Sequence, residues 1–312
     1  MSDFRTQLKR GLRTGIKRGW SSFIWICKIV VPVSLLAALI QWTGWLNQLD
    51  FLLHPLMSLI NLPAAAALPI ITAVVVSFYA ALAIMAVLPF TIGQMTLIAL
   101  FIMIAHMLIM EGMLQHKSGF NIIKATLVRI SAAILTVLIV SQFLGATSQS
   151  IVLPADLTVH TPFIEVLKSW AIDTLGLCGR IFVIIMLVIT LLESLQTLGW
   201  IQYLLKFFRP FMRILGLSNQ AVTMWVPAAG FGLLYGGAVI TEEAKKGALT
   251  REELEHLHIS IGINHAIVEE TALFLALGLN VFWLLIPRFV TATIAVHTCR
   301  AIQYLKSKSL PK

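Results

Sequence analysis

The sequence predicts an all-α polytopic membrane protein made of two inverted repeats, each with three transmembrane helices, an interfacial helix and a broken or re-entrant segment. Of its 312 residues, 58% are hydrophobic and 12% are charged, whereas soluble domains carry about 25% charge. Several windows hold roughly 20 mostly apolar residues, enough to cross the hydrocarbon layer. A series of polar residues also recurs at constant spacing in the two halves, which indicates a duplication.

Charge and motif content exclude several functions. The net charge of +9 comes from basic residues in the tails and short loops, as in cytoplasmic loops of membrane proteins, so nucleic acid is not an expected partner. No serine elbow, HExxH motif or nucleotide fingerprint occurs, so we expect neither an enzyme nor a cofactor. Cys27, Cys178 and Cys299 lie far apart in sequence and lack zinc-site spacing; we interpret them as small core residues.

The first repeat is expected over residues 20–144, after a basic cytoplasmic tail over 1–19 whose apolar continuation shows no signal-peptide cleavage site. Its first span carries Pro32, and its broken segment carries Pro69, both residues that interrupt helices. The predicted elements are a span over 23–42, an interfacial stretch over 50–62, a broken apolar segment over 64–88, and spans over 97–114 and 122–143.

An extracytoplasmic linker is expected over residues 145–176, and the second repeat over 177–301. The segment 200–215 alternates aromatics with basic residues and has no acid, which suits a helix lying on an anionic inner surface. The other predicted elements are a span over 177–198, a glycine-broken segment starting near Pro227, a long polar helix over 252–277, a span over 281–300 and a basic tail over 302–312.

Two sets of matched residues support the duplication. Hydrophobic bias produces chance matches of leucine and isoleucine, but not a polar series in register. Pairs 155 residues apart are Gly44/Gly199, Trp45/Trp200, Pro55/Pro210 and Met57/Met212; pairs 159 residues apart are His106/His265, Glu111/Glu270, Gly119/Gly278, Asn121/Asn280 and Arg129/Arg288.

The relative orientation of the repeats depends on whether the broken segments are re-entrant hairpins or full spans. A hairpin gives each half an odd number of crossings and inverts the second copy. The linker 145–176 holds one base, Lys168, whereas the loop 116–124, the segment 206–213 and both tails are basic. This distribution favours inversion, with both termini in the cytoplasm.

The polar helix over 252–277 is the candidate site, because ionisable groups at membrane depth usually face a bundle interior or a water-filled path. Helical spacing places Glu255, His258, Gly262, His265 and Glu269 on one face, with Ser260, Asn264 and Thr271 beside it and Glu270 further round. Three interpretations stay open: a wall for a hydrogen-bonding solute, a path for a metal or proton, and a structural pair of His265 with Glu269.

Two arginines and a glycine cluster complete the candidate site. Arg129 and Arg288 cannot lose their charge, so each needs an acceptor such as Glu111, Glu270 or a carbonyl; they clamp spans together or bind an anionic substrate group. Gly230, Gly232, Gly236 and Gly237 predict a helix break that exposes backbone groups, with the site beside Gly236 and Gly237; Ser77 in the first half predicts a weaker one.

These residues carry a family resemblance. The order GxGxLYGGAxxxEE, GxLTxEE, INHAIVEET, LGxN and PR resembles the nucleoside-recognition or "Gate" domain of the spore maturation A and B proteins and of the permease part of ferrous-iron transporter B. It covers 177–301 well and 20–144 more loosely. The resemblance implies a multi-spanning, transporter-like protein and leaves its substrate open; the chain has no GTPase domain, and its cysteines lie outside the glycine-broken segments.

The expected function is therefore a multi-pass permease of the inner membrane that moves a small polar solute, such as a nucleoside, at the repeat interface. The alternatives are a divalent-metal (ferrous iron) permease and a non-transporting membrane assembly factor. Besides the lipid bilayer, the expected partners are the solute or ion and, as an open question, further copies of the chain. The expected substrate-binding residues are Tyr235, Gly236, Gly237, Asn264, His265, Glu269, Glu270 and Arg288 in the second half, and His106, Glu111 and Arg129 in the first.

Overall fold

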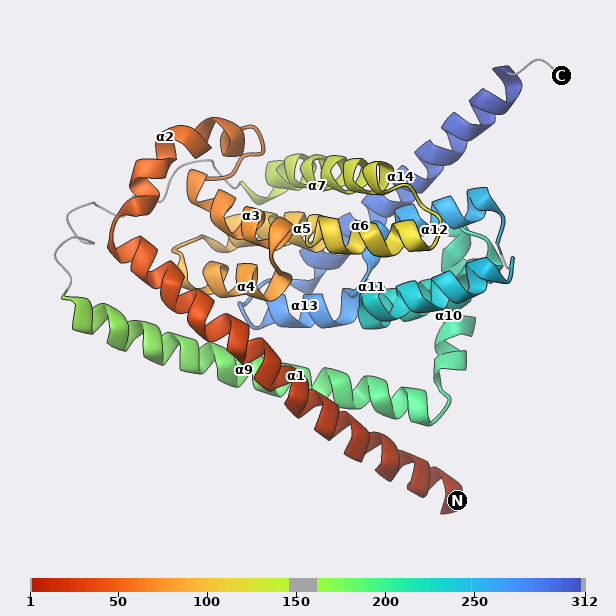
Figure 1. Cartoon of the computed structure of the whole chain (residues 1–312), viewed down its shortest axis with the longest axis horizontal. Coiled ribbons are helices and arrows are strands. Elements are labelled where there is room, and N and C mark those ends of the chain that lie inside the picture. The colour runs from red at the N-terminus through yellow and green to blue at the C-terminus, as the bar shows by residue number, and fades with distance from the viewer. Residues whose placement is uncertain (1, 146–161, 248, 310–312) are drawn as a thin grey trace.

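The computed structural model describes residues 2–145, 162–247 and 249–309, and throughout these residues its regular structure is helical (Figure 1). Half of the predicted linker, residues 146–161, lies outside the described residues. Its second half corrects the prediction, because the chain from Phe163 on is already part of helix α9 (Phe163–Thr197). The helices are α1 (Ser2–Trp42), α2 (Trp45–Ser58), η1 (Ala64–Ala66), α3 (Ala67–Val75), α4 (Phe78–Val87), α5 (Ile92–Ala105), α6 (Leu108–Lys117), α7 (Ile122–Leu144), α9 (Phe163–Thr197), α10 (Ile201–Ile214), η2 (Asn219–Ala221), α11 (Val222–Lys245), α12 (Arg251–Asn264), α13 (Ile267–Leu275) and α14 (Val281–Ser309).

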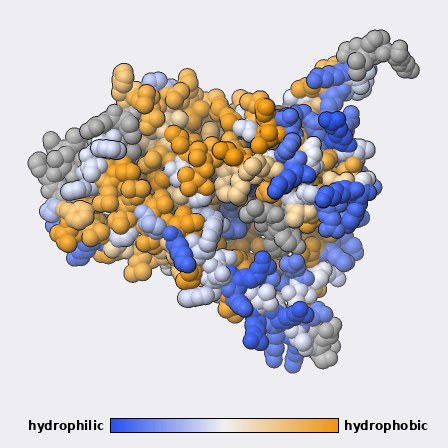
Figure 2. All heavy atoms as spheres, in the orientation of Figure 1, coloured by the Kyte–Doolittle hydropathy of each residue, from blue (hydrophilic) through white to orange (hydrophobic). Residues whose placement is uncertain are grey.

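The chain is a multi-span helical membrane protein. Among the described residues, five stretches are long and apolar enough to cross a membrane: Phe4–Trp42, Ile92–Lys117, Ile122–Leu144, Phe163–Thr197 and Val281–Lys308. On the face in Figure 2, apolar atoms cover most of the surface, while hydrophilic atoms gather at one end. That end carries the start of α1, the end of α14 and the connection from α11 to α12 (Figures 1 and 2). Both described termini, at Ser2 and Ser309, therefore share one polar side.

Helices α1 and α9 form a long antiparallel pair along one side of the molecule (Figure 1). A Cβ added to Gly15 would lie 2.6 Å from the Cα of Thr190, and one added to Gly11 would lie 2.9 Å from the Cα of Ser194. Glycines on this face let the two backbones touch, as in small-residue contacts between transmembrane helices. Because α1 begins at Ser2, the basic segment expected as a tail is part of this helix, and Arg18 pairs with Glu193 of α9.

The pairing of α1 with α9 makes a direct prediction. The sulfur atoms of Cys27 and Cys178 lie 3.8 Å apart, although both cysteines were expected to be isolated core residues. Mild oxidation with copper–phenanthroline should join them, because only a small shift brings the sulfurs to bonding distance. Mass spectrometry should find the linked peptides, with Cys299 unlinked as the internal control. Separate labelling of Cys27 and Cys178 without a linked product would contradict the pairing.

Both helices that carry the site's histidines are broken, which corrects two sequence predictions. The expected continuous span over 97–114 divides into α5 and α6, and the expected helix over 252–277 divides into α12 and α13. In the first break Met107 is left-handed (φ 44, ψ 40), and in the second Ala266 is left-handed (φ 48, ψ 30). Left-handed conformations are costly outside glycine, so the surrounding structure must hold both breaks in place.

Among the four glycines expected to break this segment, Gly232 makes the bend (φ 82, ψ 169), whereas Gly236 and Gly237, beside which the site was expected, are helical. A Cβ on Gly236 would lie 2.4 Å from the Cα of Ala228, so the two arms of α11 fold onto each other. In the first half, α3 and α4 are separate helices joined through an extended Ser77 (φ −166, ψ 153). The prediction of a weaker break in the first half is therefore wrong: the Ser77 hydroxyl supplies the cap of α4 by accepting from the Ala80 N–H.

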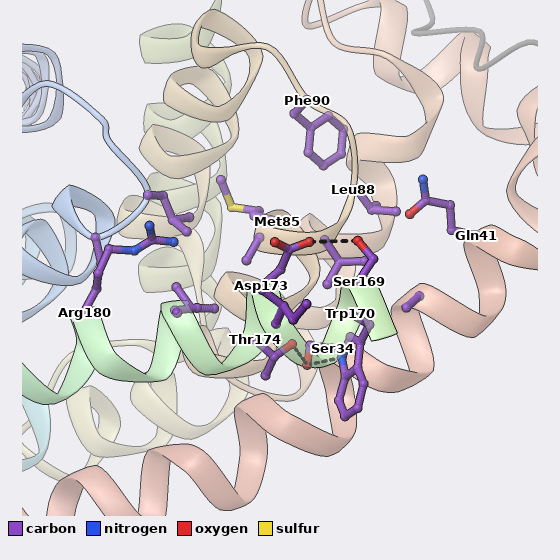
Figure 3. A pocket seen from close by; sticks show the side chains of 18 of the residues that line it. Ser34, Gln41, Met85, Leu88, Phe90, Ser169, Trp170, Asp173, Thr174 and Arg180 are labelled. Atoms are coloured by element: carbon purple, nitrogen blue, oxygen red, sulfur yellow. Dashed lines mark hydrogen bonds between the residues drawn. The ribbon is translucent and has the colours of Figure 1, made fainter. Parts of the chain in front are cut away.

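A cavity of about 1260 Å³ lies between the α1–α9 pair and the rest of the bundle (Figure 3). Its walls include the ends of α4 and α13 around Phe90 and Gly278. A smaller cavity of about 380 Å³ lies at the ends of α6 and α11, beside Lys117 and Glu242. The larger cavity adjoins α4 and α13, and the smaller one adjoins α6 and the second arm of α11. Each of these helical segments begins near a break in the helix and reaches the cavity at its other end.

Candidate functional site

The two broken helices are built in the same way. Helices α5 and α12 each begin with a capping box, Thr91 with Gln94 and Thr250 with Glu253, and each ends at a histidine in an extended conformation. In the second box, the hydrogen bond from the Thr250 N–H lowers the pKa of the Glu253 carboxyl. Since each cap stabilises its helix from the start, both helices run unbroken to their histidines.

Hydrogen bonds from a neighbouring hairpin support each break. The Met107 N–H donates to the Ala73 carbonyl of α3 over 2.8 Å, and the Ala266 N–H donates to the Ala228 carbonyl of α11 over 3.2 Å. The left-handed residue of each break thus satisfies its N–H outside its own helix, as buried backbone groups require.

The two arginines take up the carbonyls at the breaks. Arg129 donates from Nε to the Ile104 carbonyl (2.7 Å) and from Nη2 to the His106 carbonyl (2.8 Å). Arg288 donates in the same way to Ile263 (3.0 Å) and His265 (3.0 Å). A helix that stops leaves its last carbonyls without partners, and a planar guanidinium can satisfy two of them at once. The clamping role expected for the arginines is therefore found.

Each arginine also pairs with a glutamate from the same half. Arg129 Nη1 lies 2.6 Å from Glu111 Oε2, and Arg288 Nη1 lies 3.4 Å from Glu270 Oε2. All four side chains are buried. Two positive and two negative charges thus balance inside the bundle, which lowers the cost of burying any one of them.

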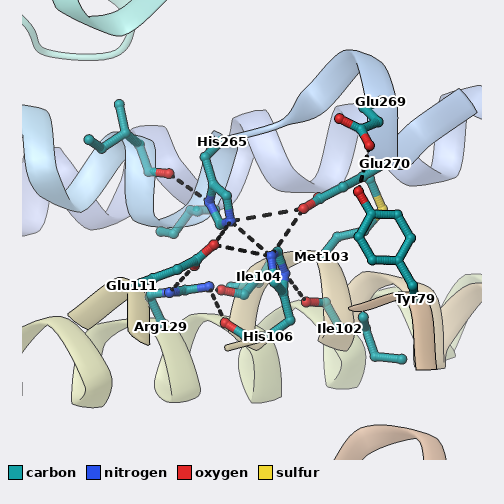
Figure 4. A network of polar contacts seen from close by, with 12 residues as sticks. Tyr79, Ile102, Met103, Ile104, His106, Glu111, Arg129, His265, Glu269 and Glu270 are labelled. Atoms are coloured by element: carbon teal, nitrogen blue, oxygen red, sulfur yellow. Dashed lines mark hydrogen bonds and ion pairs between the residues drawn. The ribbon is translucent and has the colours of Figure 1, made fainter. Parts of the chain in front are cut away.

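The other carboxylate oxygens meet both histidines, in a cluster that we call the centre: His106, Glu111, His265 and Glu270 (Figure 4). The Nε2 atoms of His106 and His265 are 3.3 Å apart. Glu111 Oε1 lies 3.3 Å and 3.2 Å from these two nitrogens, and Glu270 Oε1 lies 3.2 Å and 3.9 Å from them. Residues distant in sequence are therefore brought within contact distance by the two breaks.

The hydrogen bonds of the imidazoles decide which atoms face inward. His106 Nδ1 lies 3.0 Å from the Ile102 carbonyl, and His265 Nδ1 lies 3.0 Å from the Ile261 carbonyl. Since a carbonyl only accepts hydrogen bonds, each Nδ1 must carry a proton. In a neutral imidazole the Nε2 atom is then unprotonated and offers a lone pair. Two lone pairs and two carboxylate oxygens facing one another require a cation between them, either a proton or a metal ion.

The structure separates the roles of the adjacent acids Glu269 and Glu270. A continuous helix would place Glu269 on the face of His265 and within reach of it. The break at Ala266 instead brings Glu270 to the centre, while Glu269 accepts a hydrogen bond from the Tyr79 hydroxyl over 2.6 Å. Of the three interpretations left open by the sequence, the structural pair of His265 with Glu269 is therefore wrong. The ring of Tyr79 in turn contacts Trp25 of α1, with centroids 5.1 Å apart.

The remaining predicted site residues lie around this cluster. Asn264 is fully buried, and neither of its amide atoms has a hydrogen-bond partner among the described residues. Gly236 and Gly237 lie in the second arm of α11, and the side chain of Tyr235 is outside the described part of the structure. An unpaired buried amide costs about 1–3 kcal/mol, so Asn264 is a group for which a ligand would be favourable.

Other residues of the predicted polar face have structural roles. His258 meets the Ser118 hydroxyl at 3.0 Å and stacks on Phe120, and its carbonyl accepts from Gln115. Glu255 pairs with Lys124 and accepts from Gln303. These contacts join α12 to the first half and to α14, away from the centre.

Sequence reasoning missed Arg180, a charged residue in the middle of α9 that lines the large cavity. A lone basic residue inside an otherwise apolar span is a signal of function and could have drawn attention to it. Its acidic neighbour Asp173 was assigned to the linker, because the predicted span began at Leu177 instead of at Phe163.

The chain is a homologue of a known membrane protein. It is 26% identical over 288 residues to the uncharacterized membrane protein YvoD of Bacillus subtilis (strain 168), a match that covers 91% of each chain. No family model matches the sequence, and no solved structure matches it. The relative supports the assignment to a membrane, the multiple spans rest on the helices of the structure, and the chemistry of the site rests on its own geometry.

Proposed function

We propose that the protein is a permease of the cytoplasmic membrane, built from two inverted repeats, and that its centre binds a small cation during transport. The observation that carries this proposal is that one oxygen of Glu111 and one of Glu270 each lie within 3.2–3.9 Å of both His106 Nε2 and His265 Nε2, which are themselves 3.3 Å apart. Only acceptors face this space, and atoms so close leave room for an ion and not for a nucleoside.

Matching local geometry supports the two repeats. The left-handed residues Met107 and Ala266 are 159 residues apart, as are the clamps Arg129 and Arg288. The interruptions at Ser77 and Gly232 are 155 residues apart, the spacing of the pairs in the first part of each half. Discontinuous helices that meet near the midplane are a recurrent feature of inverted-repeat transporters.

Inversion is supported by the folding back of the interrupted segments. The two arms of α11 contact each other through Gly236 and Ala228, and α3 packs against α4. Such hairpins enter and leave on one side, which gives each half an odd number of crossings. The basic polar end shared by both described termini is then the cytoplasmic side, by the positive-inside rule.

A divalent metal ion fits the donor set. His106, His265 and Glu270 offer ligand atoms that all lie within 4.8 Å of one another. Metal–ligand bonds of about 2.0–2.1 Å place tetrahedral ligands about 3.3 Å apart, close to the distances at the centre. The carbonyl acceptors of the Nδ1 atoms hold the rings as outer partners of metal-bound histidines do.

Proteoliposomes with two reporters test the proposal. One dye inside the vesicles reports pH, and a second reports entry of Mn²⁺ or Fe²⁺. Vesicles that contain the protein should take up protons, Mn²⁺ or Fe²⁺ faster than vesicles without protein. In the double variant His106→Gln with His265→Gln, this flux should fall at least tenfold. His256→Gln is the matched control, because His256 lies on α12 but meets Gln303 instead of the centre. Silence of both reporters, or unchanged flux in the double variant, would refute the proposal.

A further inference from the structure

Arg180 occupies an unusual position in a membrane-spanning helix. It is the central residue of α9, with 17 residues on each side between Phe163 and Thr197, in a stretch apolar enough to cross the membrane. Its side chain is exposed and lines the large cavity (Figure 3). At about 1.5 Å per residue, either end of the helix is about 25 Å away.

No acceptor for Arg180 exists among the described residues. The other two arginines within the bundle contrast with it, since Arg129 and Arg288 each have a glutamate and at least two carbonyls. A guanidinium keeps its charge under all ordinary conditions. A charge at membrane depth is costly and normally faces a partner or a water-filled path, so Arg180 calls for an anion from outside the chain.

The cavity beside Arg180 has an ordered polar wall. Trp170 Nε1 donates to the Ser34 hydroxyl over 3.0 Å, and Ser34 in turn meets Thr174 at 3.4 Å. Ser169 donates to Asp173 over 3.3 Å. These groups satisfy one another (Figure 3), and the guanidinium of Arg180 is the one cation of the described lining. With about 1260 Å³, the cavity has room for a small organic molecule.

Asp173 adds a second recognition point. It lies seven residues before Arg180, which is about 10 Å along a helix and nearly the same face. Figure 3 shows both side chains on the same side of α9. A ligand with an anionic group at one end and a hydroxyl or ammonium donor at the other would match both charges.

Two helices connect the cavity to the neighbourhood of the centre. Its wall includes Met85 of α4 and Leu275 of α13. These helices carry Tyr79 and Glu269 at their opposite ends, joined by the 2.6 Å hydrogen bond beside the centre. A molecule in the cavity thus lies about two helical turns from the cation site.

We propose that this cavity binds a small organic anion, held through its carboxylate or phosphate group by Arg180 and through a donor group by Asp173. The inference rests on the proposed function and names its solute: the anion travels with the cation of the centre. Arginine suits this role because its fork donates two parallel hydrogen bonds to a carboxylate or phosphate.

Ligand-induced shifts of the melting temperature test the proposal on the full chain in nanodiscs of phosphatidylethanolamine. The probes are glutamate, lactate and inorganic phosphate, each of which carries an anionic group and an ammonium or hydroxyl donor. At least one should raise the melting temperature, because a ligand that binds only the folded state stabilises it. Arg180→Gln should abolish the shift, and Arg180→Lys should weaken binding about tenfold since lysine lacks the bidentate fork. Arg209→Gln, on the exposed face of α10, is the matched control.

Nanodiscs with phosphatidylglycerol separate a free anion from a lipid headgroup. If the anionic lipid alone stabilises the protein through Arg180 and no soluble probe does, the cavity is a lipid site and the proposal is wrong. It is also wrong if Arg180→Gln and the parent protein respond equally to every probe. Cation flux without anion binding would refute the anion site and leave the proposed permease standing. Anion binding without cation flux would refute the proposed permease and leave an anion site at Arg180.

Discussion

Replacing Arg288 with leucine is expected to lower the free energy of unfolding by about 3–5 kcal/mol, the usual cost of leaving a buried charge without its partner. Glu270 would lose its cation, and the carbonyls of His265 and Met103 would lose their donor. The melting temperature in detergent should fall by roughly 10 °C, measured by loss of the monodisperse peak after heating.

Two further variants make that result specific. Arg300→Leu removes an exposed arginine from the same helix and should shift the melting temperature little. Combining Arg288→Leu with Glu270→Leu removes both charges and should recover part of the loss, because an apolar pair costs less than an unpaired buried charge. Equal melting temperatures for Arg288→Leu and Arg300→Leu would show that the clamp does not hold the break.

Gly236→Ala is expected to lower the free energy of unfolding by about 3 kcal/mol, the upper part of the usual range for overpacking. The added Cβ would lie 2.4 Å from the backbone Cα of Ala228 and 2.4 Å from its Cβ. Neither arm of the α11 hairpin can yield without moving the Ala228 carbonyl that supports the break at Ala266. Thermal melting and cation flux should therefore decline together.

The neighbouring glycine provides the control for this prediction. A Cβ on Gly237 would meet only the Cβ of Leu114, at 4.0 Å, which is ordinary contact. Gly237→Ala should leave the melting temperature unchanged or raise it slightly, since alanine favours a helix by about 0.5–1 kcal/mol. If both alanines behaved alike, the two arms of α11 would not be in contact.

Several features followed from residue types without any structure. The low share of charged residues and the apolar windows of roughly 20 residues determined that this is a membrane protein. A chain with so few charged residues has too little polar surface to cover a soluble fold of this size. The polar series at a spacing of 159 residues pointed to His106, His265 and Glu270. The need of Arg129 and Arg288 for acceptors pointed to Glu111, Glu270 and carbonyls, which are their partners in the structure.

The tertiary structure decided where the helices stop. Nothing in local propensity marks Met107 or Ala266 as left-handed, since both are ordinary helix formers. Their N–H groups are taken by Ala73 and Ala228 from separate hairpins, and such long-range partners are not encoded in a local window. For the same reason helical spacing placed Glu269 on the face of His265 and Glu270 further round, the reverse of what the break produces.

Sequence alone thus determined that this is a multi-pass membrane protein with matched ionisable residues in its two halves. Only the folded chain decided that two interrupted helices turn those residues toward one another, with Nε2 of each histidine facing inward because a carbonyl holds Nδ1. The physical reason is the low polarity of the interior: every buried charge and every freed backbone group must find a partner, and those partners come from distant parts of the chain.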